Sequence, residues 1–197
     1  MLTSASRANG RTIYLLSDEA YNRILFTGAR FTSPTAHYPE SLLLYSYGKT
    51  LLSPGQRLGY LAVVPAMAQR EAMREAVTVS QFNGYGVPDA VLQHALPSIE
   101  HLCIDLAQLE HRRDVMVGAL RAQGYELHVP EGTFYLLPRS PVPDDVAFTR
   151  QLAADDVFVL PGSIVEMPGY FRISLTATDE MVERSLPRFA QAMASAQ

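Results

Sequence analysis

The sequence predicts an α/β fold, and two observations support this class. Short apolar runs, typical of buried strands, alternate with longer stretches in which apolar residues recur at helical spacing. The second half of the chain changes to shorter strands with helices between them, which predicts a separate α+β layer. The chain has 197 residues, 48% of them hydrophobic, which is enough for one large domain or two small ones.

Composition excludes several kinds of partner and site. The formal net charge of −4 gives no basic surface, so no nucleic acid partner is expected. No apolar run reaches the length that spans a bilayer, so no membrane partner is expected either. Cys103 is the only cysteine, which excludes an internal disulfide and favours a cytoplasmic location. The five histidines lack ligand spacing, so no metal site is expected.

In the first half of the chain, three apolar runs predict strands. The segment before them, 1–12, is polar and has no periodic apolar face, and 24–39 predicts an irregular loop over a site. A helix with an alanine-rich buried stripe is predicted at 67–79, followed by a turn-rich loop at 80–87. The predicted strands are 13–16, 42–45 and 58–64.

In the second half, prolines help to place the helices. Pro88 fits the first turn of a helix, and Pro97 is expected to kink or break it. A long amphipathic helix is predicted at 98–122, where Gly124 closes it. Pro187 would cost about 3 kcal/mol inside the last helix, so a bend or a division of that helix is expected there. The remaining elements are strands at 125–129, 133–137, 157–160 and 171–175, with helices at 144–154 and 179–194.

The most informative stretch follows the strand at 42–45. Lys49 lies just past the end of that strand, with Arg57 eight residues later. A lysine in such a turn is most often solvated, but a partly desolvated amine can form a Schiff base with an aldehyde. The triplet at 48–50 also matches the end of a phosphate-binding P-loop. That motif requires a glycine where Leu43 stands, so the P-loop is excluded.

An acidic residue and a tyrosine follow the first predicted strand. Asp18 stands at the carboxyl end of that strand, where α/β sheets place their ligands, although a loop or helix cap would explain it equally well. Tyr21 follows three residues later. Sequence position therefore makes Asp18 a candidate ligand-binding residue.

These segments resemble the class I and II aminotransferases, the fold-type I enzymes that use pyridoxal 5'-phosphate (PLP). The resemblance rests on Asp-Glu-x-Tyr after the first strand and on Ser-x-x-Lys followed by Gly-x-Arg-x-Gly-Tyr. The residues of the second pattern are Ser46, Lys49, Gly55, Arg57, Gly59 and Tyr60. Gly48 departs from the family pattern, because many relatives carry a second serine there.

The resemblance implies a role for each of these residues. Lys49 would be the catalytic residue that forms the Schiff base with PLP and moves the α-proton of the substrate. As a buried carboxylate, Asp18 would keep the pyridine nitrogen protonated, and Tyr21 would donate a hydrogen bond to the phenolic oxygen. Arg57, assisted by Ser46, would hold the phosphate.

A third segment adds a candidate substrate residue. Pro-Gly-Ser at 161–163 precedes a strand that carries Arg172, Ile173 and Ser174. In the family, an arginine in this strand binds the substrate α-carboxylate, a task that its planar, permanently charged guanidinium suits. Strand alternation alone would make Arg172 an ordinary exposed residue.

The resemblance also implies an architecture. It identifies the chain as the C-terminal portion of a PLP-dependent transferase fold that lacks the N-terminal half of the cofactor domain. Residues 1–97 would be the remaining part of the PLP-binding large domain, and 98–197 the connecting helix and small α+β domain. A homodimer is expected, with an amino acid and a 2-oxo acid as substrates.

The absent half would supply much of the phosphate cradle, so the chain is expected to be a fragment or a truncated form. In isolation it should bind PLP weakly and turn over poorly. Two alternatives stay open. One is another fold-type I enzyme, such as a carbon–sulfur β-lyase or an aminocyclopropane-carboxylate synthase. The other is a non-catalytic remnant that only dimerises or binds a partner.

Overall fold

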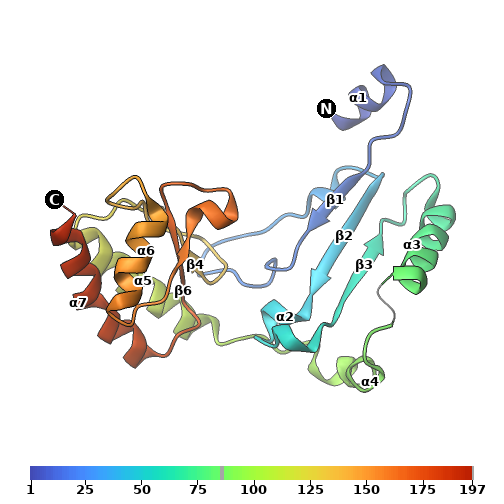
Figure 1. The fold of residues 1–197 in the computed structure, drawn as a ribbon. Coiled ribbons are helices and arrows are strands. Elements are labelled where there is room, and N and C mark those ends of the chain that lie inside the picture. The colour runs from blue at the N-terminus through green and yellow to red at the C-terminus, as the bar shows by residue number, and fades with distance from the viewer. Residues whose placement is uncertain (85–86, 197) are drawn as a thin grey trace. The chain divides into compact units, whose positions relative to one another are not determined.

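The computed structural model describes residues 1–84 and 87–196, and Figure 1 shows its mixture of helices and short sheets. The chain forms two compact units. Unit 1 comprises Met1–Ile24 and Arg30–Ile104, and unit 2 comprises Leu25–Ala29 and Asp105–Gln197. The sequence predicted a division after residue 97, into the remaining part of the large domain and the connecting helix with the small domain. That assignment of domains stays a prediction.

Unit 1 is built on a three-stranded sheet of order β1-β2-β3. β1 pairs with β2 in parallel and β2 pairs with β3 in antiparallel, with Asp18 opposite Leu44 and Ser46 opposite Gly59. The carboxyl ends of β1 and β2 and the start of β3 therefore share one edge of the sheet. The three strands are β1 (Leu15–Asp18), β2 (Ser41–Ser46) and β3 (Gly59–Val63). They confirm the predicted strands with end shifts of a few residues.

Helices and turns complete unit 1. They are α1 (Leu2–Ala8), η1 (Pro34–Ala36), α2 (Tyr47–Thr50), η2 (Pro54–Gln56), α3 (Arg70–Gly84) and α4 (Ala90–Ile99). A small core forms around Tyr45, Tyr47 and Leu58, against which side chains of β2, α2 and α4 pack. This core lies directly beneath the segment that carries Lys49, so apolar packing fixes that segment on the sheet.

Two helices of unit 1 differ from the sequence prediction. α1 forms at 2–8, in the segment without a periodic apolar face, and it buries none of its residues. α3 begins later than predicted and continues to Gly84, through most of the predicted loop at 80–87, of which residues 85 and 86 lie outside the described part. The alanines of its predicted buried stripe are exposed, although α3 packs along β3.

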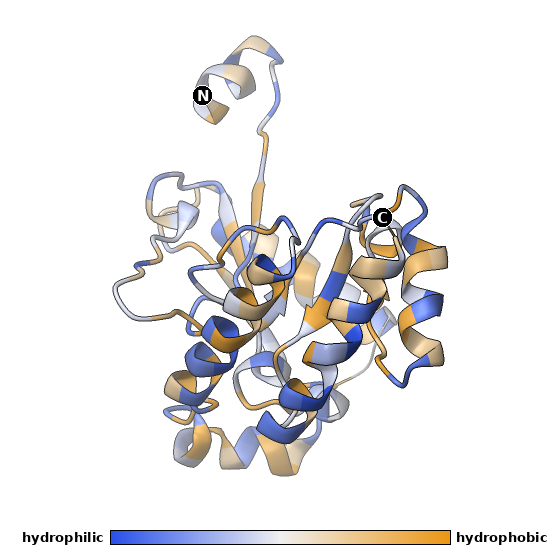
Figure 2. Cartoon of the chain, turned by 90° about the vertical axis from the view of Figure 1, so that its left-hand side faces the viewer, coloured by the Kyte–Doolittle hydropathy of each residue, from blue (hydrophilic) through white to orange (hydrophobic). Residues whose placement is uncertain are grey.

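Unit 2 packs three helices against a small antiparallel sheet of order β4-β6-β5. Its elements are α5 (Leu106–Ala122), β4 (Tyr135–Leu136), α6 (Asp145–Ala154), β5 (Leu160–Pro161), η3 (Gly162–Val165), β6 (Phe171–Ser174) and α7 (Asp179–Ser195). The rings of Phe148, Phe171 and Phe189 surround Tyr125 in the core. Figure 2 shows hydrophobic and hydrophilic residues alternating along the helices, as amphipathic helices require.

The long helix predicted at 98–122 is wrong, because residues 100–105 separate α4 from α5. The Asp105 side chain accepts a hydrogen bond from the Gln108 amide and caps α5. The Ile104 amide instead donates to the Thr50 carbonyl, at 2.9 Å. Pro97 lies inside α4, which ends two residues later, at Ile99.

The strand predicted at 125–129 is also wrong. The Tyr125 amide donates to the Leu120 carbonyl and closes α5, and its side chain packs among the phenylalanine rings instead of joining a ladder. The two later helices hold better, since α6 and α7 fall within one residue of their predicted bounds. Of the strand predicted at 157–160, only Leu160 lies in β5. α7 continues through Pro187 as one assigned helix.

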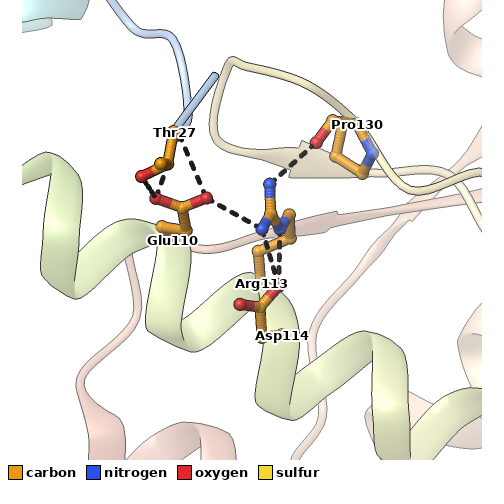
Figure 3. Close-up of polar contacts among 5 residues, drawn as sticks. All are labelled: Thr27, Glu110, Arg113, Asp114 and Pro130. Atoms are coloured by element: carbon orange, nitrogen blue, oxygen red, sulfur yellow. Dashed lines mark hydrogen bonds and ion pairs between the residues drawn. The ribbon is translucent and has the colours of Figure 1, made fainter. Parts of the chain in front are cut away.

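Residues 25–29 belong to unit 2 although unit 1 surrounds them in sequence. Figure 3 shows Thr27 facing Glu110 of α5, beside Arg113. The Thr27 hydroxyl donates to Glu110 at 2.7 Å, and the Arg113 guanidinium stacks 4.4 Å over the Phe26 ring. The segment is therefore fastened to α5 by both polar and apolar contacts. Within the described residues, no helix could cross a membrane.

Candidate active site

Lys49 lies in α2, a single helical turn that starts directly after β2 (Figure 1). Its ammonium nitrogen stands 5.5 Å from the centre of the Tyr21 ring. A cation over an aromatic face is attracted by the ring quadrupole, so this contact holds the lysine toward the end of β1. Lys49 is also the only lysine of the sequence, whose other basic residues are arginines. The sequence prediction did not use this signal, although it is visible in the printed sequence.

Asp18 ends β1 at the same edge of the sheet, one strand away from β2. Its Oδ1 accepts a hydrogen bond from the Ala20 amide at 3.2 Å, which folds the chain toward Tyr21. The sequence prediction expected this carboxylate to be buried, but Asp18 is exposed. The buried carboxylate of the segment is its neighbour Glu19, which is 3% exposed.

Arg57 and Ser46 are the predicted phosphate residues, and both lie in unit 1. Ser46 is the last residue of β2 and precedes α2. Arg57 is exposed and lies two residues before β3, in the left-handed region with φ of 53°. Its guanidinium donates to the Pro54 carbonyl of its own turn at 3.1 Å. The topology thus brings Asp18, Ser46 and Arg57 to the edge that carries Lys49.

Two glycines shape this edge. A Cβ at Gly59 would lie only 2.4 Å from the Tyr45 carbonyl oxygen, so a glycine is required where β3 approaches β2. A Cβ at Gly48 would lie 3.1 Å from the Pro54 Cα, which makes the usual family serine a tight fit here. The departure at Gly48 therefore coincides with close packing of the 53–54 turn on α2.

Three tyrosines stack beside the lysine-bearing segment. The Tyr60 ring lies 5.3 Å from the Tyr45 ring, and Tyr45 meets Tyr47 edge to face at 5.0 Å. Burial raises the pKa of the Tyr47 phenol, and the Glu100 charge raises it further. Burial likewise raises the pKa of the Tyr60 phenol, so both phenols keep their protons to a higher pH than a free tyrosine would.

Arg172 lies in unit 2, on β6 opposite Leu160. Its guanidinium stacks 4.2 Å over the Tyr135 ring, which fixes the plane of the group. Its neighbours Phe171 and Ile173 are buried, so Arg172 points to the other face of the strand. This is the alternation expected from the sequence.

A family model described as aminotransferase class I and II matches residues 3–189. The chain belongs to the class I and II aminotransferase family. It is 31% identical to an aspartate/prephenate aminotransferase of Thermus thermophilus over 196 residues, which are 93% of this chain and 49% of that protein. It is 28% identical to a probable aspartate/prephenate aminotransferase of Thermus aquaticus over 195 residues, 96% of this chain and 50% of that protein.

Solved structures of aminotransferases share the fold. An aminotransferase from Eubacterium rectale matches 100% of this chain with a TM-score of 0.91 and 27% identity, over 50% of its own length. An aspartate aminotransferase from Thermotoga maritima matches 96% of the chain with a TM-score of 0.80, also at 27% identity over 50% of its length. The chain thus spans about half the length of the relatives that it matches.

The edge of unit 1 fits the cofactor of this family, whose members are PLP enzymes. It offers a primary amine, a carboxylate, a phenol, a hydroxyl and a guanidinium at the adjoining ends of three neighbouring strands and in the turns next to them. These are the groups that an aldehyde, a pyridine nitrogen, a phenolic oxygen and a phosphate require. The cation–π contact of Lys49 with Tyr21 shows that two of them already meet.

Proposed function

We propose that this chain carries the cofactor lysine and part of the substrate site of a PLP-dependent aminotransferase, which transfers an amino group between an amino acid and a 2-oxo acid. The observation that carries the proposal is the position of Lys49, the only lysine, over Tyr21 at the edge where Asp18 ends β1. A surface cation can be arginine or lysine, but only a primary amine can form a Schiff base.

Each side chain then has a task. When bound, PLP supplies an aldehyde that condenses with amines and a ring that accepts the electron pair released at the α-carbon of an amino acid. Lys49 would hold the cofactor through its amine and, as general acid and base, would move the proton at the substrate α-carbon. Asp18 retains the proton of the ring nitrogen by its negative charge, and Tyr21 donates a hydrogen bond to the phenolic oxygen.

The charged ends of the ligands require cationic partners. Arg57 and the Ser46 hydroxyl bind the phosphate, because an exposed guanidinium and a hydroxyl at the start of α2 both donate hydrogen bonds to oxyanions. Arg172 binds the substrate α-carboxylate through its planar fork, which stacking on Tyr135 holds in one orientation. The names of the Thermus relatives make aspartate the first amino donor to test.

Family membership also supports two further proposals, a homodimeric assembly and a cytoplasmic location. No described side chain of α3 or α4 is fully buried within this chain, and exposed apolar residues such as Phe82 and Val91 leave surface for a second copy to cover.

Trapping of the cofactor on the purified chain tests the proposal. The chain is mixed with PLP and reduced with borohydride, and the modified residue is located by mass spectrometry. We expect modification at Lys49, with the amino group of Met1 as an internal reference for non-selective reaction. Lys49→Arg keeps the positive charge and is the matched control. Equal labelling of Met1 and Lys49, or unchanged total labelling in Lys49→Arg, would refute the proposal.

A further inference from the structure

Glu19 is a buried carboxylate between the two candidate cofactor residues at the end of β1. It is 3% exposed, whereas its neighbour Asp18 is exposed. Removing a carboxylate from water is costly unless hydrogen bonds replace the lost hydration. The tasks proposed for Asp18 and Tyr21 give Glu19 no part in the chemistry, so its burial requires another reason.

The contacts of Glu19 join three segments of unit 1. Its side chain accepts hydrogen bonds from the side-chain amide of Asn22 at 3.2 Å and from the Ser33 hydroxyl. Ser33 caps η1 by accepting from the Thr35 amide, so the carboxylate ties the 18–22 turn to η1. The Glu19 backbone amide donates to the Leu44 carbonyl at 2.8 Å and continues the pairing of β1 with β2.

The turn that these contacts hold is the one that carries Asp18 and Tyr21. The Asn22 backbone amide donates to the Glu19 backbone carbonyl at 3.1 Å, and the Ile24 backbone amide donates to the Tyr21 carbonyl at 2.9 Å. Tyr21 in turn meets the Lys49 ammonium group. A change in the backbone conformation of this turn would therefore move the Tyr21 ring away from Lys49 and the Asp18 carboxylate away from the edge of the sheet.

We propose that Glu19 is a positioning residue, which fixes the turn of Asp18 and Tyr21 against Lys49 through its bonds to Asn22 and Ser33. The relevance of this role to a cofactor site rests on the proposed function. Both donors to the carboxylate are neutral, an amide and a hydroxyl. Glutamine can accept from Asn22 and donate to Ser33, so hydrogen bonding rather than charge carries the role.

The first test needs no cofactor. Hydrogen exchange of the purified full chain is followed by mass spectrometry on a peptide that contains residues 18–24. We expect Glu19→Ala to speed exchange of the Asn22 and Ile24 amides at least about tenfold, and Glu19→Gln to stay close to wild type. Glu40→Ala is the matched control, because the Glu40 side chain accepts from the Ala68 amide at the opposite end of β2. Unchanged exchange in Glu19→Ala would overturn the proposal.

The second test separates a positioning role from a purely structural one. The absorbance of the chain loaded with PLP is titrated with pH. A hydrogen bond from Tyr21 to the deprotonated form lowers the pKa of the bound chromophore, so Tyr21→Phe and Glu19→Ala should both raise that pKa, by about one pH unit. Glu19→Gln should leave it unchanged. Faster exchange in Glu19→Ala with an unshifted chromophore would overturn the positioning role.

The two tests also distinguish this inference from the proposed function. If the wild-type chain forms no chromophore with PLP, the proposed function fails, and the exchange test alone decides whether Glu19 holds the turn.

Discussion

Replacement of Gly59 by alanine is the sharpest test of how the site edge is built. The added Cβ would lie 2.4 Å from the Tyr45 carbonyl oxygen and 3.4 Å from the Ser46 Cα. Close carbon–oxygen contacts in sheets are about 3.3 Å, so β3 must move away from β2 by nearly an ångström. Overpacking of this kind and a weakened ladder bond together cost about 2 to 4 kcal/mol.

Urea unfolding followed by circular dichroism measures this cost. With an m-value of about 2 kcal/mol per molar urea, the midpoint should fall by roughly 1 to 2 M. Gly55→Ala is the matched control, because it removes a glycine from the adjoining turn, where a Cβ would meet no atom within 4 Å. Equal midpoints for the two variants would show that the close approach of β3 to β2 is not a constraint.

Two further predictions concern pH and unit 2. Hydrogen bonds from the Thr27 side chain and backbone, together with the Arg113 charge, lower the pKa of Glu110 below its ordinary 4.5. The ionised Glu110 carboxylate therefore stabilises the fold fully above pH 4.5, and this contribution is lost as pH falls through the lower pKa of the folded state. Glu110→Gln should therefore show a shallower loss of stability on acidification, and an identical acid profile in urea titrations would contradict this. Burial raises the pKa of Tyr125 above its ordinary 10.0, so its contribution is complete below pH 10 and falls as pH rises further. Tyr125→Phe should lower stability by about 1 to 3 kcal/mol at pH 7, because it leaves the Phe189 carbonyl without its donor. It should also lose less stability than wild type between pH 9 and 11, and a parallel decline would contradict the assignment.

Periodicity predicted the elements whose bonds are local. The helices α6 and α7 were found close to their predicted bounds because each has a local apolar pattern and a capping residue, Asp144 or Thr178. The strands around 13–16 and 42–45 were found because each is a short apolar run, although their ladder bonds join distant segments. The break between α4 and α5 was missed because part of its cause is not local. The Ile104 amide bonds to Thr50, and Arg23 donates to the Glu100 carbonyl at 2.6 Å. Within 98–122 the local signal of the break is the cap residue Asp105, and the prediction did not use it.

The site was predicted from motifs rather than from periodicity, and the structure adds physical reasons for some of their residues. Gly59 is explained by the approach of β3 to β2, and the resemblance alone gave no such reason. The exposure of Asp18 and the burial of Glu19 could not be predicted, since both are acidic and adjacent, and only the direction of the turn separates them. The roles of Asp18, Tyr21, Ser46, Lys49, Arg57 and Arg172 stay predictions until the cofactor is trapped.

The exposure of Asp18 also bears on the expected weak binding of PLP by the chain alone. A carboxylate that faces water attracts a ring-nitrogen proton 4 Å away by about 1 kcal/mol, whereas the same pair in an effective dielectric of 20 gains about 4 kcal/mol. The geometry of the edge can therefore be correct while the electrostatic support of the cofactor is slight. The relatives carry about as much chain again as this one. Any polypeptide that covers this edge would strengthen the attraction at Asp18 without moving it, so affinity for PLP depends on what excludes water there as much as on the residues that the chain supplies.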